Sequence, residues 1–217
     1  MAQRTLVDPA ETAMHAGLPS RTVLQQWRDL SPVLSGRGLV LREPRLSDAA
    51  TLFTSLSSDE VGRFIASPPS TVDGFERFIL WAREQRMAGE AVSFAVVPQG
   101  TDGPVGLFQV RRVEQDFSIA EWGFILGASF WGNGTFFAAA PLVIDFAFEV
   151  LGVHRLEARA AVLNGRGNNA LRKLGAVQEA LLRKSLERSG DYLDQVLWSI
   201  VADDWRSLRP VRDLRVH

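Results

Sequence analysis

A strand-like segment followed by a glycine-bearing loop is the part of this sequence best suited to chemistry. Residues 119–126 read as a β-strand, and the loop Phe130-Trp131-Gly132-Asn133-Gly134-Thr135 leads from it into an apolar stretch. Backbone N–H groups at a helix start are unpaired and lie at the positive end of the helix dipole. Glycines also let the backbone approach a ligand closely. Such a turn is suited to binding a pyrophosphate, although an ordinary strand–turn–helix explains the glycines equally well.

Several standard catalytic motifs are absent. No Gly-Lys-Ser/Thr follows the loop, so it is not a Walker A motif, and its spacing is not G-x-G-x-x-G. Residues 127–131 do not form a G-x-S-x-G nucleophile elbow. The chain has no cysteine, which excludes disulfides, thiol nucleophiles and cysteine metal sites. His15, His154 and His217 are far apart in the sequence, which argues against a zinc site, so no metal is expected.

Glu121 is the candidate general base. Side chains alternate between the faces of a strand, so Glu121 shares its face with Ile119 and Ile125. A carboxylate among such neighbours is expected to be partly buried. The alternative is a structural glutamate that pairs with an arginine such as Arg111 or Arg159. The strand pattern alone favours this alternative.

An N-terminal extension over residues 1–36 precedes the segments that position these groups. Ser20 is suited to cap a helix in it. Four apolar residues of that helix share one face at helical spacing: Val23, Leu24, Trp27 and Leu30. We interpret the helix as one that packs on the domain or on a second subunit, rather than as part of a catalytic site.

The remaining elements are expected in the order β-α-α-β-β-β-α-β-α-β-β. Ser47 is predicted to cap the first helix after the opening strand, and Gly89 to end the second. The predicted strands cover residues 39–42, 93–97, 105–113, 119–126, 154–162, 176–186 and 192–201. The predicted helices cover residues 47–56, 71–87, 135–151 and 164–173. This order predicts an α+β fold with a mixed central sheet, made of an antiparallel N-terminal meander, a βαβ crossover and a C-terminal hairpin, flanked by helices.

Composition narrows the class of protein. The 217 residues are 46% hydrophobic with a net charge of −1, enough for one domain with a sizeable core but without a basic field that would attract nucleic acid. No run of about 20 apolar residues is present to span a membrane, and the start lacks a signal-peptide pattern. A soluble, cytoplasmic protein without membrane or nucleic-acid partners is expected.

Residues 38–205 resemble the RimJ/RimL-type acetyltransferases of the GNAT superfamily. The order and spacing of several motifs carry this resemblance. These are Leu39-Val40-Leu41-Arg42 with Asp48, Ala120-Glu121-Trp122-Gly123-Phe124, Phe130-Trp131-Gly132-Asn133-Gly134, Leu151-Gly152-Val153-His154-Arg155-Leu156-Glu157-Ala158, Asn164 with Leu171, Lys173, Leu174 and Gly175, and finally Arg183, Asp191-Tyr192, Asp194 and Trp198. The resemblance implies a GNAT domain over residues 37–206, followed by a C-terminal tail over residues 207–217.

The resemblance also implies an activity. Members of this superfamily transfer an acyl group, usually from acetyl-CoA, directly to a primary amine of a small molecule or a protein N-terminus. Glu121 then takes the role of catalytic base. The implied acyl-CoA-binding residues are Phe124, Ile125 and Leu126 beside the pantetheine arm, Trp131, Gly132, Asn133, Gly134, Thr135 and Phe136 in the phosphate loop, and Asn164 on the opposite side. The resemblance is also compatible with a homodimer.

Two of the implied roles have structural alternatives. Asn164 is also a common type of turn residue before a helix. Tyr192 is the only tyrosine and could protonate the leaving thiolate, but a structural role is the favoured interpretation. The acceptor is expected near Phe53, Phe64, Trp81 and Tyr192, in a partly apolar pocket.

Three departures from the family pattern leave other functions open. Phe136 replaces a small residue, and its ring is predicted to pack in the core along a stripe with Ala140, Val143 and Ala147 rather than in the phosphate site. Pro141 is expected to kink or delay the helix. Gly167 replaces a serine. These changes support, as an alternative, an acyl-CoA-binding domain without turnover. A nucleotide-binding module is disfavoured because the phosphate-binding lysine is missing.

Overall fold

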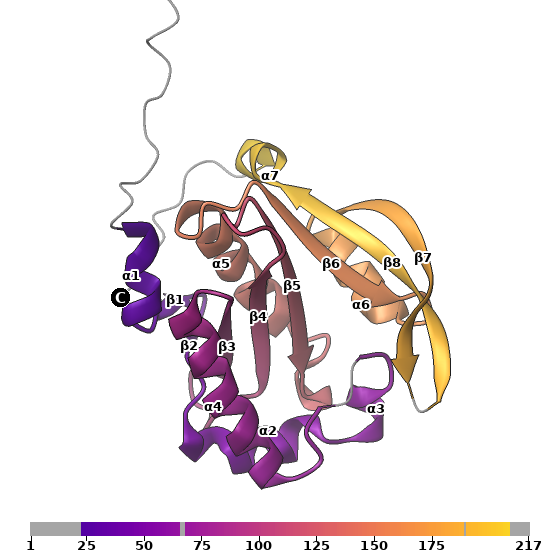
Figure 1. Cartoon of the computed structure of the whole chain (residues 1–217). Coiled ribbons are helices and arrows are strands. Elements are labelled where there is room, and N and C mark those ends of the chain that lie inside the picture. Colours follow the sequence, from indigo (N-terminus) through magenta and orange to yellow (C-terminus); the bar gives the residue numbers. More distant parts are fainter. Residues whose placement is uncertain (1–22, 66–67, 189, 209–217) are drawn as a thin grey trace, which may run out of the picture.

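A mixed eight-stranded sheet runs through the whole molecule (Figure 1). The computed structural model describes residues 23–65, 68–188 and 190–208. The strands lie in the order β1-β2-β3-β4-β5-β6-β8-β7. Their bounds are β1 (Leu34–Gly36), β2 (Leu39–Arg42), β3 (Ala91–Pro98), β4 (Gly106–Arg112), β5 (Ile119–Leu126), β6 (Arg155–Ala161), β7 (Val177–Arg188) and β8 (Asp191–Val201). The predicted α+β architecture is confirmed, with a meander, a crossover between β5 and β6, and a final hairpin.

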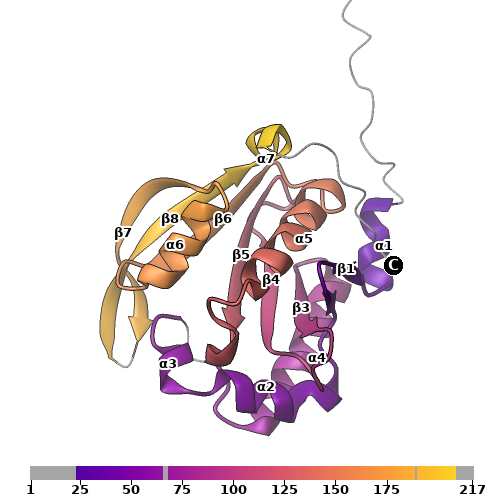
Figure 2. The same cartoon turned by 180° about the vertical axis from the view of Figure 1, so that it is seen from behind.

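Helices cover both faces of the sheet. The helical segments are α1 (Val23–Asp29), η2 (Leu46–Asp48), α2 (Ala49–Leu56), α3 (Asp59–Gly62), α4 (Val72–Ala88), η3 (Ala128–Phe130), α5 (Thr135–Glu149), α6 (Gly165–Lys173) and α7 (Ala202–Leu208). In Figure 1, α2 and α4 lie in front of the sheet. The view from behind in Figure 2 brings α5 and α6 forward. Each face therefore has its own apolar core, the larger one under α5 and the smaller one under α2 and α4.

The ends of α4 follow from local sequence chemistry. The side-chain oxygen of Thr71 accepts a hydrogen bond from the Gly74 N–H at 3.0 Å, which satisfies one of the free donors at the helix start. Gly89 ends the helix in the left-handed region with φ of 75°, where a residue with a side chain is strained. The predicted helix over residues 71–87 is therefore confirmed together with its stop signal.

The predicted cap of α2 is wrong. Ser47 lies inside η2, and Asp48 occupies the N-cap position of α2. The Asp48 carboxylate binds the Arg42 guanidinium through contacts of 2.6 and 2.8 Å and accepts the Arg45 N–H at 2.8 Å. Burial alone would raise the pKa of Asp48, but the hydrogen bonds from Arg42 and Arg45 outweigh it and lower the pKa below its usual value. This pair ties β2 to the start of α2.

Pro141 lies inside α5, which begins at Thr135 without delay. Because proline has no N–H, it cannot donate to the carbonyl of Phe137 one turn earlier. The guanidinium of Arg37 donates to that oxygen at 3.0 Å instead. A residue before β2 therefore satisfies the acceptor that the proline leaves free, and the expected late start of the helix is wrong.

The sequence did not predict β1, α3 or α7, all of which are short. In the N-terminal helix, Trp27 is buried and its ring meets Phe117 edge-on at 5.8 Å, but Leu30 is exposed and does not share this contact. The predicted cap Ser20 lies outside the described residues, as does the tail beyond Leu208. No helix within the described ranges has the length and apolar character needed to cross a membrane.

Candidate active site

The sheet splits between β5 and β6. These two parallel strands pair only where Ile119, Ala120 and Glu121 face Arg155, Leu156 and Glu157. Beyond Glu121 they diverge, as Figure 1 shows, while the opposite side of β5 stays paired with β4 as far as Leu126. Main-chain groups of residues 122–126 that point toward β6 therefore lack a strand partner. They line an opening in the middle of the sheet.

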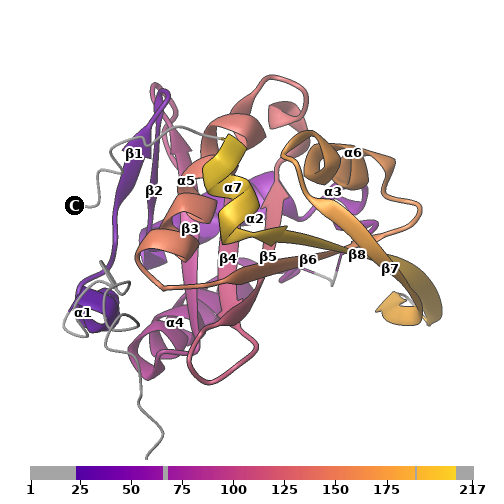
Figure 3. The same cartoon turned by 90° about the horizontal axis from the view of Figure 1, so that it is seen from above.

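Two cavities meet at this split. The first has a volume of about 620 Å³ and lies between the loop before α5, the start of α6 and α3. The second has a volume of about 500 Å³ and lies between the sheet, α2 and α4. Six residues line both cavities: Phe64, Ile65, Phe124, Ile125, Asn164 and Gly167. The view from above in Figure 3 places α5 and α6 on the opposite side of the sheet from α4, and α2 packs with α4 in the smaller core. A ligand bound in the split is therefore accessible from both faces.

The loop before α5 presents free backbone donors to the first cavity. Gly132 and Gly134 have φ of 74° and 90°, values that residues with side chains rarely adopt. The side-chain oxygen of Asn133 accepts from the N–H and the hydroxyl of Thr135, at 3.1 and 2.8 Å. The first α-helical bond runs from the Ala138 N–H to the Gly134 carbonyl. The N–H groups of Phe136 and Phe137, in the first turn before Ala138, are therefore not used by the helix and suit an anionic group.

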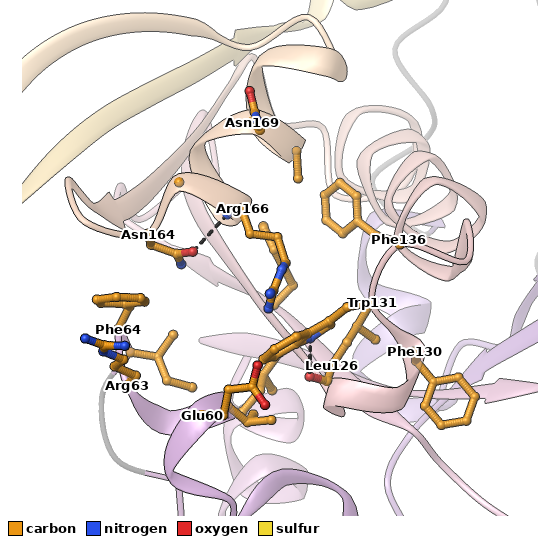
Figure 4. A pocket seen from close by; sticks show the side chains of 18 of the residues that line it. Glu60, Arg63, Phe64, Leu126, Phe130, Trp131, Phe136, Asn164, Arg166 and Asn169 are labelled. Atoms are coloured by element: carbon orange, nitrogen blue, oxygen red, sulfur yellow. Dashed lines mark hydrogen bonds between the residues drawn. The ribbon is translucent and has the colours of Figure 1, made fainter.

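Trp131 connects this loop to the end of β5. Its indole N–H donates to the Leu126 carbonyl at 2.8 Å, and the Arg166 guanidinium lies 3.6 Å from the ring centre (Figure 4). Arg166 was not singled out from the sequence. The sequence feature that could have identified Arg166 as a site residue was its position at the start of a helix, two residues after Asn164. The exposed Arg63 and Lys173 line the same cavity, so three cations line it together with the carboxylate of Glu60.

Asn164 is the N-cap of α6. Its side-chain oxygen accepts from the Gly167 N–H at 2.9 Å, so its structural interpretation is confirmed. A Cβ atom on residue 167 would lie only 2.6 Å from the side-chain nitrogen of Asn164, so Gly167 is what allows this cap. A serine there would displace the Asn164 side chain. Asn164 also lines both cavities.

Phe136 packs on the core and lines the first cavity at the same time. Its ring centre lies 4.5 Å from that of Phe124 and 6.0 Å from that of Phe108. The ring is only partly buried, whereas Ala140, Val143 and Ala147 of the same helix are fully buried. The predicted core stripe is therefore correct, and Phe136 is its end at the cavity wall (Figure 4).

Glu121 lines the second cavity and pairs with both predicted arginines. Its side chain is 23% exposed. Its Oε2 lies 2.9 Å from Arg111 Nη2 and 3.9 Å from Arg159 Nε. No hydrogen bond from the described residues reaches Oε1. The salt-bridge interpretation of Glu121 is confirmed, and the second carboxylate oxygen remains available to a substrate.

The residues expected around the acceptor do not come together. Phe64 lines both cavities. Phe53 instead packs against the smaller core, and Trp81 and Tyr192 are exposed. Tyr192 lies in β8 opposite Glu187, with 58% of its surface exposed, and lines neither cavity. Among the described residues, no group of three or more His, Cys, Asp or Glu side chains could hold a metal ion.

Comparisons with known proteins agree with this geometry. The family model described as "Acetyltransferase (GNAT) domain" matches residues 38–177. The "Uncharacterized N-acetyltransferase p20" of Bacillus licheniformis is 28% identical over 168 residues, which cover 77% of this chain and 94% of that protein.

Solved structures show the same fold. Mycobacterium smegmatis RimJ in complex with CoA-disulfide has a TM-score of 0.72 and 23% identity, covering 82% of this chain and 90% of that chain. Ribosomal-protein-S5-alanine acetyltransferase from Vibrio fischeri has a TM-score of 0.70 and 23% identity, covering 80% and 98%. The family model matches most of the sheet, and the chain has a split sheet with a glycine loop at the start of α5. The chain therefore belongs to the GNAT acetyltransferase domain family and is an N-acetyltransferase.

Proposed function

We propose that this protein moves the acetyl group of acetyl-CoA directly to a primary amine, carried by a small molecule or a protein N-terminus. The observation that carries the proposal is the pair of cavities that meet at the split between β5 and β6. One cavity has the anion-binding loop, and the other has the carboxylate of Glu121. A donor and an acceptor that enter from opposite faces would meet beside β5.

The first cavity is the donor side of this proposal. The pyrophosphate of acetyl-CoA binds the backbone donors of the loop and first turn other than the Thr135 N–H, and Arg166 and Lys173 add positive charge. The pantetheine arm lies along the unpaired edge of β5 at residues 124–126, opposite Asn164. Trp131 supports this edge through the Leu126 carbonyl. The M. smegmatis RimJ structure, which contains CoA-disulfide, supports a donor of this type in this fold.

Glu121 is the proposed base for the transfer. Its Oε1 takes a proton from the acceptor ammonium, and the nitrogen lone pair then forms a bond to the thioester carbon. An unpaired N–H of residues 124–126 stabilises the negative charge on the carbonyl oxygen. The C–S bond breaks, CoA leaves as the thiolate, and the thiolate takes up the second proton that the acylated nitrogen loses to become the amide. Arg111 holds Oε2 and so fixes the orientation of the carboxylate.

A second function has specific support. The Phe136 ring lines the donor cavity, and Glu121 already has two arginine partners. Both features suit a domain that binds acyl-CoA without turning it over and serves a structural or regulatory role. The name of the V. fischeri neighbour, a ribosomal-protein-S5-alanine acetyltransferase, supports a protein as acceptor in the catalytic case.

Thermal-shift measurements with acetyl-CoA, CoA and ATP test the donor assignment. We expect the two CoA compounds to raise the melting temperature and ATP to have little effect, because a bound ligand stabilises the folded state. Product formation with a panel of primary amines and N-terminal peptides then separates the enzyme from the CoA-binding domain. A failure of CoA to bind at millimolar concentration would show that the assignment of this loop is wrong.

A further inference from the structure

We propose that the acceptor is a free α-amino acid with a bulky apolar side chain, bound as a zwitterion between Glu121 and Arg159. This inference rests on the proposed function, because it places the acceptor in the second cavity. It adds the chemical class of the acceptor and a residue that selects it.

The second cavity is lined by one acidic and one basic side chain. Among the described residues that line it, Glu121 and Arg159 are the charged ones, and the nearest atoms of this pair lie 3.9 Å apart. An α-amino acid carries its ammonium and carboxylate on a single carbon atom. A carboxylate and a guanidinium a few ångströms apart therefore match both of its charges, with the ammonium on Glu121 and the carboxylate on Arg159.

Arg159 has unused binding capacity. It lies in β6 two residues beyond Glu157, the last residue of that strand paired with β5, and Leu197 of β8 is its partner on the other side. The side chain is 43% exposed and donates no hydrogen bond to any described residue. Its planar fork of N–H groups is thus free to bind a carboxylate in a bidentate manner.

Arg111 positions the Glu121 carboxylate and does not contact the acceptor. It contacts the same Oε2 atom at 2.9 Å, but it does not line the cavity and is 55% exposed. The two arginines therefore differ: Arg111 fixes the carboxylate from outside the cavity, and Arg159 faces the space where an acceptor would bind. Oε1 of Glu121 remains for the ammonium group.

The rest of the cavity fits an apolar side chain. Phe64, Phe78 and Leu186 are among the residues that line it. Gly123 lies beside Glu121 on the same face of β5, and a Cβ atom there would have no neighbour within 4 Å. The missing side chain leaves open space next to the carboxylate. A substituent on the acceptor can fill this space and bury apolar surface.

A peptide N-terminus lacks the feature that Arg159 would recognise. In a peptide the α-carboxyl group is part of an amide bond and carries no charge. Leucinamide models this difference, because it keeps the amine and the side chain of leucine and removes the carboxylate. The ratio of kcat/KM for leucine to kcat/KM for leucinamide therefore measures the proposed contact directly.

The experiment measures this ratio for the native protein, Arg159→Gln and Arg111→Gln with saturating acetyl-CoA. We expect the native enzyme to prefer leucine and Arg159→Gln to reduce the ratio by about 10–100-fold, the usual effect of losing a charged hydrogen-bonded pair. Arg111→Gln should lower both activities while leaving the ratio unchanged, because it acts through Glu121. Melting curves and CoA titrations establish that each variant is folded.

Three outcomes would overturn the inference. A native enzyme that uses leucinamide or N-terminal peptides as well as leucine, or better, contradicts it but leaves the proposed function intact. A ratio that stays unchanged in Arg159→Gln also contradicts it, because the carboxylate then binds elsewhere. If no amine of any kind is acetylated while CoA binds, the proposed function itself fails and this inference fails with it.

Discussion

The guanidinium of Arg166 lies 3.6 Å from the centre of the Trp131 ring. The two residues come from different elements, one from the start of α6 and the other from the loop before α5, and both line the first cavity. The stacked pair therefore joins the two helix starts across the mouth of the proposed donor site. It also holds a positive charge next to the free backbone donors of the loop.

Replacement of Arg166 tests this charge. We expect Arg166→Ala to weaken CoA binding by about 5–20-fold, since one charged contact contributes roughly 1–2 kcal/mol. The loss should shrink at high salt, because exposed charges are screened. Calorimetric titration measures both effects. Arg172→Ala removes the same charge from the same helix outside the cavity, so an equal loss in that control would mean that only net charge matters.

Replacement of Glu121 tests the base. Glu121→Gln should lower kcat at neutral pH by about 10²–10⁴-fold with little effect on CoA affinity, the usual scale for a general base. The matched control is Glu157→Gln, since Glu157 faces Glu121 across β5 and β6 but does not line either cavity. That control should keep kcat within about threefold of the native value. Full activity of Glu121→Gln would reduce Glu121 to a structural partner of Arg111.

Phe136 is expected to matter more for stability than for donor binding. Phe136→Ala removes contacts with Phe124 and Phe108 and should cost about 1–3 kcal/mol, less than for a fully buried phenylalanine. Phe137→Ala should lower the free energy of unfolding by less, because the Phe137 side chain is exposed. Denaturant unfolding gives both values. An unchanged stability together with tighter CoA binding would show instead that the ring obstructs the donor cavity.

The Asp48 carboxylate should make stability depend on acid pH. Its pKa is lowered from 3.8, so its stabilising effect is complete above that value and is lost as the pH falls through the lower native pKa. Asp48→Asn should cost about 3 kcal/mol at neutral pH, because it leaves the Arg42 charge buried without its partner. The variant should also lose less stability than the native protein below pH 4. Parallel pH dependences of unfolding would contradict this assignment.

Local patterns in the sequence were sufficient for most of the fold. The alternating strands, the range of α4 with its Gly89 stop signal and the glycine loop before α5 were predicted correctly, because each depends on neighbouring residues. The short elements β1, α3 and α7 were missed, since they carry too few residues for a periodic pattern. The cap of α2 was assigned to Ser47 because the sequence does not reveal that Asp48 is held by Arg42 and Arg45.

The sequence by itself determined the order of the elements and the position of the glycine loop. It also determined that Glu121 lies on a strand, with either a substrate or an arginine as the expected partner of its side chain. Only the tertiary structure decided which arginines reach Glu121, that Arg166 stacks on Trp131, and that Phe64 rather than Trp81 or Tyr192 lines the cavities. The physical reason is that these contacts join residues distant in sequence. Their geometry depends on where β5 and β6 stop pairing, which periodicity along one strand does not specify.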